Sequence, residues 1–85
     1  MRINPQSAEA LHDLGLGYSS AGQWEEAIEQ FRKAVGLKPN FAEAHYGLAA
    51  AYLNLGNKAA AIEEYEVLKR LNPNLASKLA PAIQQ

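Results

Sequence analysis

The apolar and polar positions along the first half of the chain predict two short amphipathic helices. Apolar or small residues recur at steps of three and four, which place them on one helix face. They are Ala10, Leu11, Leu14, Gly15 and Tyr18 in the first stretch and Trp24, Ala27, Ile28, Phe31, Ala34 and Val35 in the second. We expect helices near residues 8–20 and 23–36, with a stop near Gly22, because glycine commonly terminates a helix.

The same arrangement returns in the second half of the chain. Helical spacing recurs first in Ala44, Leu48, Ala49 and Tyr52 and then in Ala61, Ile62, Tyr65 and Leu68. These stretches predict helices near 42–55 and 58–71, joined by a turn at Gly56-Asn57. A four-residue spacing predicts a short capping helix near 75–84 from Leu75, Leu79 and Ile83. Pro81 either interrupts this last helix or lies within its first turn.

Three prolines mark a period in this pattern. Pro5, Pro39 and Pro73 are 34 residues apart, and each stands at a joint between two helices. A fixed period of this size indicates one supersecondary unit copied in tandem. We therefore divide the chain into repeats at 8–41 and 42–75. Residues 1–7 match the tail of a preceding repeat, and residues 76–85 form part of a capping helix.

Short turns force the two helices of each repeat to pack antiparallel. Small residues at facing positions, such as Gly15 against Ala27 or Ala49 against Ala61, allow the helix axes to approach closely. Most of the buried bulk is expected from Tyr18, Phe31, Tyr52 and Tyr65. A single helix pair cannot cover its own apolar faces, so neighbouring pairs must stack. The predicted fold is an all-α solenoid of antiparallel helix-turn-helix repeats.

Composition narrows the class of protein. The chain has 85 residues, 48% of them hydrophobic, with a net charge of −1 and no cysteine. This suits one small domain, excludes disulfides and gives no electrostatic reason to expect nucleic acid. No apolar run approaches membrane-spanning length, and the first residues do not form a signal peptide, which together favour the cytoplasm.

Candidate catalytic and metal-binding residues are few. His12-Asp13 and His45 are the only acid–base or metal candidates, and neither histidine has the cysteines or clustered carboxylates of a metal site. The pattern places His12 on an outer helix face and His45 at a core edge. Glu25-Glu26 and Glu63-Glu64 are interpreted as solvated faces. We therefore expect no enzyme activity, no metal and no cofactor.

The residues at fixed places in the two units resemble the tetratricopeptide repeat. The signature positions hold Leu11, Leu14, Gly15, Tyr18, Ala27, Phe31 and Pro39 in the first copy and His45, Leu48, Ala49, Tyr52, Ala61, Tyr65 and Pro73 in the second. Leu11 and His45 replace the usual Trp, and Leu68 replaces a second Ala. The resemblance implies a right-handed superhelix that acts as a protein–protein interaction scaffold.

The resemblance also implies that the first helix of each repeat lines a concave groove. With Leu11, Leu14, Gly15 and Tyr18 facing inward, the opposite face predicts a peptide- or helix-binding strip of Glu9, His12, Leu16, Glu43, Tyr46, Ala50, Leu53 and Asn54. Gly47 lies on the same stripe. Tyr46 is the favoured anchor. For Leu16 and Leu53, ligand binding and packing between adjacent first helices are equally good interpretations. The mixture favours a ligand with apolar anchors and a basic residue, bound weakly.

Some members of this family clamp the acidic tails of heat-shock chaperones with Lys and Asn on these helices. His12 and Leu16 occupy the corresponding places here, beside acidic residues, which argues against such a clamp. Two other functions stay open, namely self-assembly through open repeat ends and service as an accessory domain of a larger enzyme. Ala10 and Gly17, both small, predict that the N-terminal side of the first helix admits another helix and is prone to weak self-association.

Overall fold

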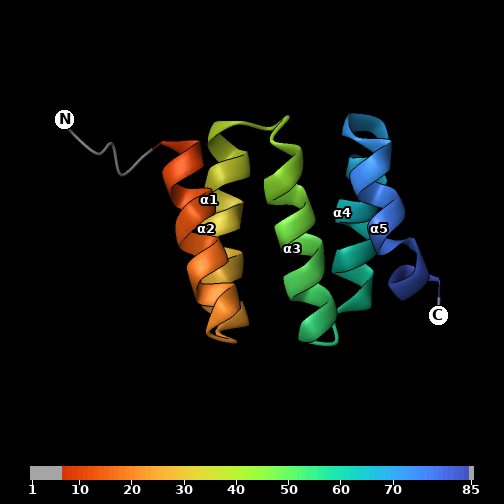
Figure 1. Cartoon of the computed structure of the whole chain (residues 1–85), viewed down its shortest axis with the longest axis horizontal. Helices are drawn as coiled ribbons and strands as arrows, with labels where there is room; N and C mark the ends of the chain where they lie inside the picture. Colours follow the sequence, from red (N-terminus) through yellow and green to blue (C-terminus); the bar gives the residue numbers. More distant parts are fainter. Residues whose placement is uncertain (1–6, 85) are drawn as a thin grey trace.

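Residues 7–84 form five helices, which are stacked along the long axis of the molecule (Figure 1). The structure is a computed structural model that describes residues 7–84. The helices are α1 (Ala8–Ser20), α2 (Trp24–Leu37), α3 (Ala42–Asn54), α4 (Lys58–Leu71) and α5 (Pro73–Ile83). The predicted all-α repeat architecture is confirmed, and the helix bounds agree with the expected ones to within two residues. Of the predicted tail at residues 1–7, only Ser7 lies within the described residues.

Glycine closes the turn inside each helix pair in the same way. Gly22 and Gly56 have φ of 77° and 81°, in the left-handed region that side chains with a Cβ disfavour. The N–H of Gln23 donates to the carbonyl of Tyr18 at 2.9 Å, and the N–H of Asn57 donates to that of Tyr52 at 2.8 Å. These bonds form a Schellman motif, which satisfies carbonyls at the helix end and turns the chain back.

Asn72 joins α4 to α5 and shifts the expected start of the last helix. Its backbone N–H donates to the carbonyl of Leu68 at 2.7 Å, while its side chain accepts from the N–H of Leu75 at 3.2 Å. Pro73 takes the first helical position, where a missing N–H costs nothing. Because the helix begins at residue 73, Pro81 lies near its C-terminal end, not in its first turn, and the helix continues to Ile83.

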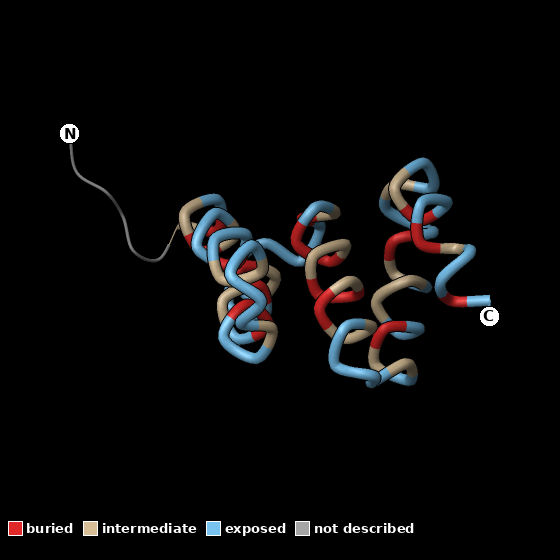
Figure 2. Tube along the Cα trace, turned by 60° about the horizontal axis from the view of Figure 1, so that its bottom comes forward, coloured by how far each residue is buried: buried red, intermediate tan, exposed pale blue. Residues whose placement is uncertain are grey.

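The helices form two layers. α1 and α5 lie in front of α2 and α4 in Figure 1, and α3 contacts both α1 and α5. Within residues 7–84, α2 and α4 make no contact with each other. The layer of α1, α3 and α5 is therefore the more closely spaced one, and we call its surface the concave side, after the groove that the sequence predicts. Buried stretches recur at intervals along the helices, as amphipathic helices require (Figure 2).

Phe31 is the centre of the first core cluster. Its side chain is fully buried, and its ring fits between two glycines of neighbouring helices. A Cβ atom on Gly15 of α1 would lie 2.7 Å from Phe31 Cε1, and one on Gly47 of α3 would lie 2.6 Å from Cζ. Gly15 thus makes room for the Phe31 ring, in addition to the expected approach to Ala27.

The buried bulk differs from the expectation in one respect. The largest fully buried side chains are Phe31, Leu48 and Leu68, whereas Tyr18, Tyr52 and Tyr65 are half-buried at the edges of the two clusters. A phenol needs a polar partner or water for its hydroxyl, so these rings stay partly open.

The inward placement of Leu14 is wrong, because this side chain is 48% exposed on the outer side of α1.

Candidate functional site

A shallow hollow of about 210 Å³ opens on the concave side, across α1, α3 and α5. Its lining is mostly apolar and consists of His12, Leu16, Glu43, Tyr46, Gly47 and Leu75. Four of these residues belong to the predicted strip, and Gly47 lies on the same stripe of its helix. Leu75 comes from the last helix, where the sequence indicated only a capping role. The 34-residue period could have indicated this position, because Leu75 is one period beyond Phe41, and Phe41 lies against His12 of the preceding first helix.

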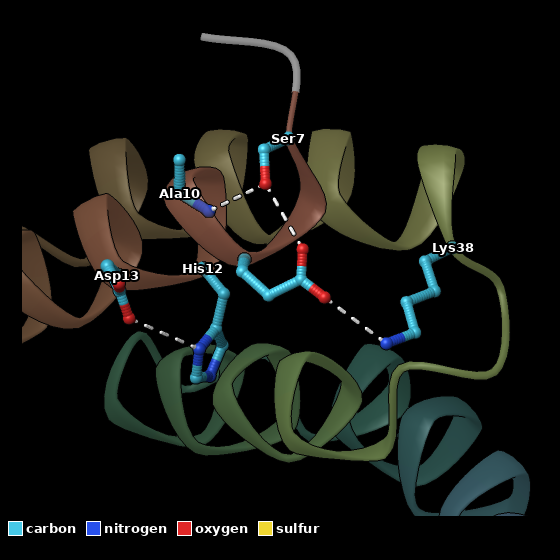
Figure 3. Close-up of polar contacts among 6 residues, drawn as sticks. Ser7, Ala10, His12, Asp13 and Lys38 are labelled. Carbon is cyan, nitrogen blue, oxygen red and sulfur yellow. Dashed lines mark hydrogen bonds and ion pairs between the residues drawn. The ribbon is translucent and has the colours of Figure 1, made fainter. Parts of the chain in front are cut away.

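His12 forms an aromatic wall of the hollow. Its ring centroid lies 4.9 Å from that of Phe41 and 5.6 Å from that of Phe31, and its side chain is only 14% exposed. Figure 3 shows the ring pointing away from α1 towards the next helix pair. The prediction of an outer-face histidine is therefore wrong. The helical period placed His12 on the correct side of α1, but the rings of Phe31 and Phe41 cover that side.

Leu16 and Tyr46 form the apolar flanks of the hollow. Leu16 is 46% exposed at its rim, whereas Tyr46 is half-buried against the second core cluster. Leu75 from α5 is half-buried in the same cluster. The hollow thus combines one open leucine with two side chains that the core holds in place. Such preorganised apolar surface binds a ligand with little loss of side-chain entropy.

The predicted strip continues beyond the hollow along α3. Ala50 and Leu53 are both half-buried, and Leu53 packs against the cluster that α4 and α5 complete. Asn54 is exposed, and its side-chain amide donates to the carbonyl of Ala50 at 2.8 Å. These three residues extend the concave strip without lining the hollow itself.

Glu9 belongs to a separate polar network at the start of α1 (Figure 3). Its carboxylate accepts from the Ser7 hydroxyl at 3.1 Å and pairs with Lys38 Nζ at 3.4 Å. The pKa of Glu9 lies below its ordinary value, first because of a hydrogen bond from its own backbone and then because of Ser7 and Lys38. Lys38 also lies 4.8 Å from the centre of the Phe41 ring. Glu9 is therefore already engaged, away from the hollow.

Glu43 is the acidic residue at the hollow itself. Its side chain is exposed, and it forms no ion pair or side-chain hydrogen bond with any other residue between 7 and 84. An exposed carboxylate beside an apolar surface offers a place for a cationic group of a ligand. Of the two acidic residues in the predicted strip, Glu43 is the one without a partner among residues 7–84.

The second histidine is structural. His45 is 8% exposed, and its Nδ1 lies 2.6 Å from Glu64 Oε1 while its Nε2 lies 2.8 Å from the carbonyl of Pro39. These contacts connect α3 to α4 and to the joint before α3. The interpretation of Glu64 as a solvated residue is therefore wrong, since its side chain is 20% exposed and bonded to His45.

Neither histidine has the surroundings of a metal centre. Among residues 7–84 no group of three or more His, Cys, Asp or Glu side chains is placed to hold a metal ion. No helix in that part of the chain is long and apolar enough to cross a membrane.

The five packed helices define a helical-repeat protein. The family model described as TPR repeat matches residues 17–56, and the model described as Tetratricopeptide repeat matches residues 42–75. The chain belongs to the tetratricopeptide repeat family. A comparison with curated proteins gives no match. Repeats of this family are generally protein–protein interaction modules and typically non-catalytic scaffolds.

Proposed function

We propose that the concave side binds a peptide or helix of a partner protein, with one apolar side chain of the ligand seated in the hollow. The hollow carries this proposal. Cavities of about 150 Å³ already admit a benzene-sized group, so about 210 Å³ accommodates a leucine, methionine or phenylalanine side chain. The strip of Ala50, Leu53 and Asn54 then provides contact surface for the flanking ligand residues.

The carboxylate of Glu43 adds a charge preference to the proposed ligand. Glu43 lies at the hollow without a partner among residues 7–84, whereas Glu9 is paired with Lys38. A ligand with Lys or Arg next to its apolar anchor therefore gains a charge-assisted contact with Glu43. Acidic ligands are disfavoured at this place. The proposed recognition element is an apolar residue adjacent to a basic one.

Affinity should be modest. Two repeats and a single capping helix offer a short strip, well below the area that a standard stable interface buries. We expect dissociation constants on the order of micromolar or weaker. Most of the binding energy should come from the anchor in the hollow, because few interface residues usually dominate.

The test uses peptides selected from a random phage-displayed library on the full chain, then synthesised and measured by calorimetry. Leu16→Ala should weaken binding about tenfold, the effect of losing about 1.4 kcal/mol. Leu55→Ala is the matched control, since Leu55 is 45% exposed and Leu16 46%, but Leu55 lies in the turn after α3. Equal binding by both variants would show that the hollow is not the site.

Charge and the tyrosine anchor are tested separately. Glu43→Gln should reduce affinity for the basic peptides and leave the melting temperature unchanged, because Glu43 has no partner to lose within the described residues. Tyr46→Phe should keep binding. Tyr46→Ala should weaken both binding and stability, since this ring is half-buried in the second cluster. Selected peptides without basic residues would contradict the role of Glu43.

A further inference from the structure

Among the helices of residues 7–84, none packs on one face of α1. Leu14 is 48% exposed at its centre, Ala10 is half-buried and Gly17 is exposed, and a Cβ atom on Gly17 would meet nothing within 4 Å. α1 lies with α2 at one end of the molecule (Figure 1), and none of these three residues lines the hollow. We call Ala10, Leu14 and Gly17 the Leu14 face.

The repeat inside the chain shows what such a face accepts. One period later the same places are held by Ala44, Leu48 and Ala51, which are 0%, 1% and 0% exposed. They belong to one buried cluster with the apolar face of α2, which comprises Ala27, Ile28, Phe31 and Ala34. The apolar face of α2, an amphipathic helix, therefore contributes to the burial of this face of α3. The Leu14 face has the same small–leucine–small pattern and fits the same kind of occupant.

One position distinguishes the two faces. Gly47 of α3 leaves the space in which the Phe31 ring sits. The equivalent residue of α1 is Asp13, whose side chain is 79% exposed and, within residues 7–84, pairs only with His12 Nδ1, at 3.9 Å. A phenylalanine at this place would strip water from a carboxylate and return no hydrogen bond, which is costly. A lysine or arginine there would satisfy the carboxylate with a charge-assisted bond.

We propose that the Leu14 face is a docking surface for an amphipathic α-helix of a partner protein. That helix carries small and aliphatic side chains against Leu14 and a lysine or arginine opposite Asp13. This interaction is independent of ligand binding in the hollow. A second copy of the chain fits less well, because its α2 and α4 already bury their apolar faces, with Phe31 and Leu68 both 0% exposed. Pairing of two α1 helices would also bring two Asp13 carboxylates into one interface.

The test adds a helical probe to the full chain. The probe is a peptide copy of residues 23–38 with a lactam between the side chains of Glu29 and Lys33. These residues are exposed, one helical turn apart, and form an ion pair on the face opposite Phe31. One version keeps Phe at position 31, and the other carries Phe31→Arg. Fluorescence anisotropy of the labelled probes gives the affinities.

The arginine probe should bind about tenfold more tightly than the phenylalanine probe. Asp13→Asn in the chain should remove most of this preference. Leu14→Lys should abolish binding of both probes, whereas the hollow variant Leu16→Ala should leave it unchanged. Absence of binding at probe concentrations on the order of 1 mM, or an equal preference in the parent chain and in its Asp13→Asn variant, would overturn the proposal.

Analytical ultracentrifugation of the chain alone tests whether a second copy of the chain binds the Leu14 face instead. The expected result is a monomer over the concentration range of the binding experiments. A concentration-dependent dimer that Leu14→Lys dissolves would assign the Leu14 face to a second copy and refute the partner helix.

Discussion

The clamp around Phe31 predicts that the same glycine-to-alanine change has opposite effects two residues apart on one helix. A Cβ atom on Gly15 would lie within 3 Å of three Phe31 ring atoms, where carbon atoms prefer about 3.5–4.0 Å. The ring has little room to move away, because it also lies close to Gly47 of α3, where an added Cβ atom would be 2.6 Å from Phe31 Cζ. Gly17, also in α1, has open space around its Cα atom.

The magnitudes follow from two opposing terms. Overpacking a well-filled core typically costs about 1–3 kcal/mol, and the closeness of three ring atoms puts Gly15→Ala at the upper end. Replacing glycine by alanine inside a helix returns about 1 kcal/mol. Gly15→Ala should therefore lose about 2 kcal/mol, whereas Gly17→Ala should gain about 0.5–1 kcal/mol. Gly47→Ala should behave like Gly15→Ala.

Urea unfolding followed by circular dichroism measures these differences. The Phe31 clamp also predicts coupling, so Phe31→Leu should cost less in the Gly15→Ala protein than in the parent, because the smaller side chain relieves the clash. If Gly15→Ala proves neutral or stabilising, like Gly17→Ala, the ring moves freely and the clamp is wrong.

The other predictions concern stability and titration. Leu68→Ala should cost about 2–5 kcal/mol in urea unfolding, since Leu68 is fully buried in the second core cluster, and a loss below about 1 kcal/mol would contradict that packing. Glu64→Leu should cost about 1–3 kcal/mol by leaving the buried His45 ring without one partner, and adding His45→Leu should recover part of the loss; strict additivity would refute the pairing. Since the pKa of Glu9 is lowered on folding, its contribution to stability is present above the unfolded pKa and disappears as pH falls through the folded one. An NMR titration should place the Glu9 midpoint below the ordinary value, and Lys38→Ala should raise it; an unchanged midpoint would argue against the Glu9–Lys38 contact.

Much of the fold was predictable because local rules determine helices. Helical spacing of apolar residues and the joints around Pro39 and Pro73 gave all five helices to within two residues at each end. The last helix shows where such rules stop. Leu75 marked its apolar face correctly, but Asn72 caps the helix and Pro73 opens it, so the start lies earlier than the apolar pattern alone indicates.

For the residues around the hollow, the sequence predicted the side of the helix on which each one lies, but not which of them are open to solvent. The period of 3.6 residues places His12, Leu16, Glu43 and Tyr46 on the predicted face, and the structure brings these four together around one hollow. Whether a side chain on that face is open depends on the neighbouring elements. Phe31 and Phe41 enclose His12, while Leu75 arrives from a helix that the strip did not include.

The sequence by itself therefore determined the helices, their repetition every 34 residues and the family to which the chain belongs. The tertiary structure was needed to show where residues at the same place in the two repeats differ in burial. Leu14 and Leu48 occupy the same place in two copies of one unit, yet one is 48% exposed and the other 1%. Burial is a property of the pair of packed surfaces, and α2 covers Leu48 while no described helix covers Leu14. The sequence pattern identifies the apolar face of a helix, whereas the tertiary structure determines whether another helix packs against that face.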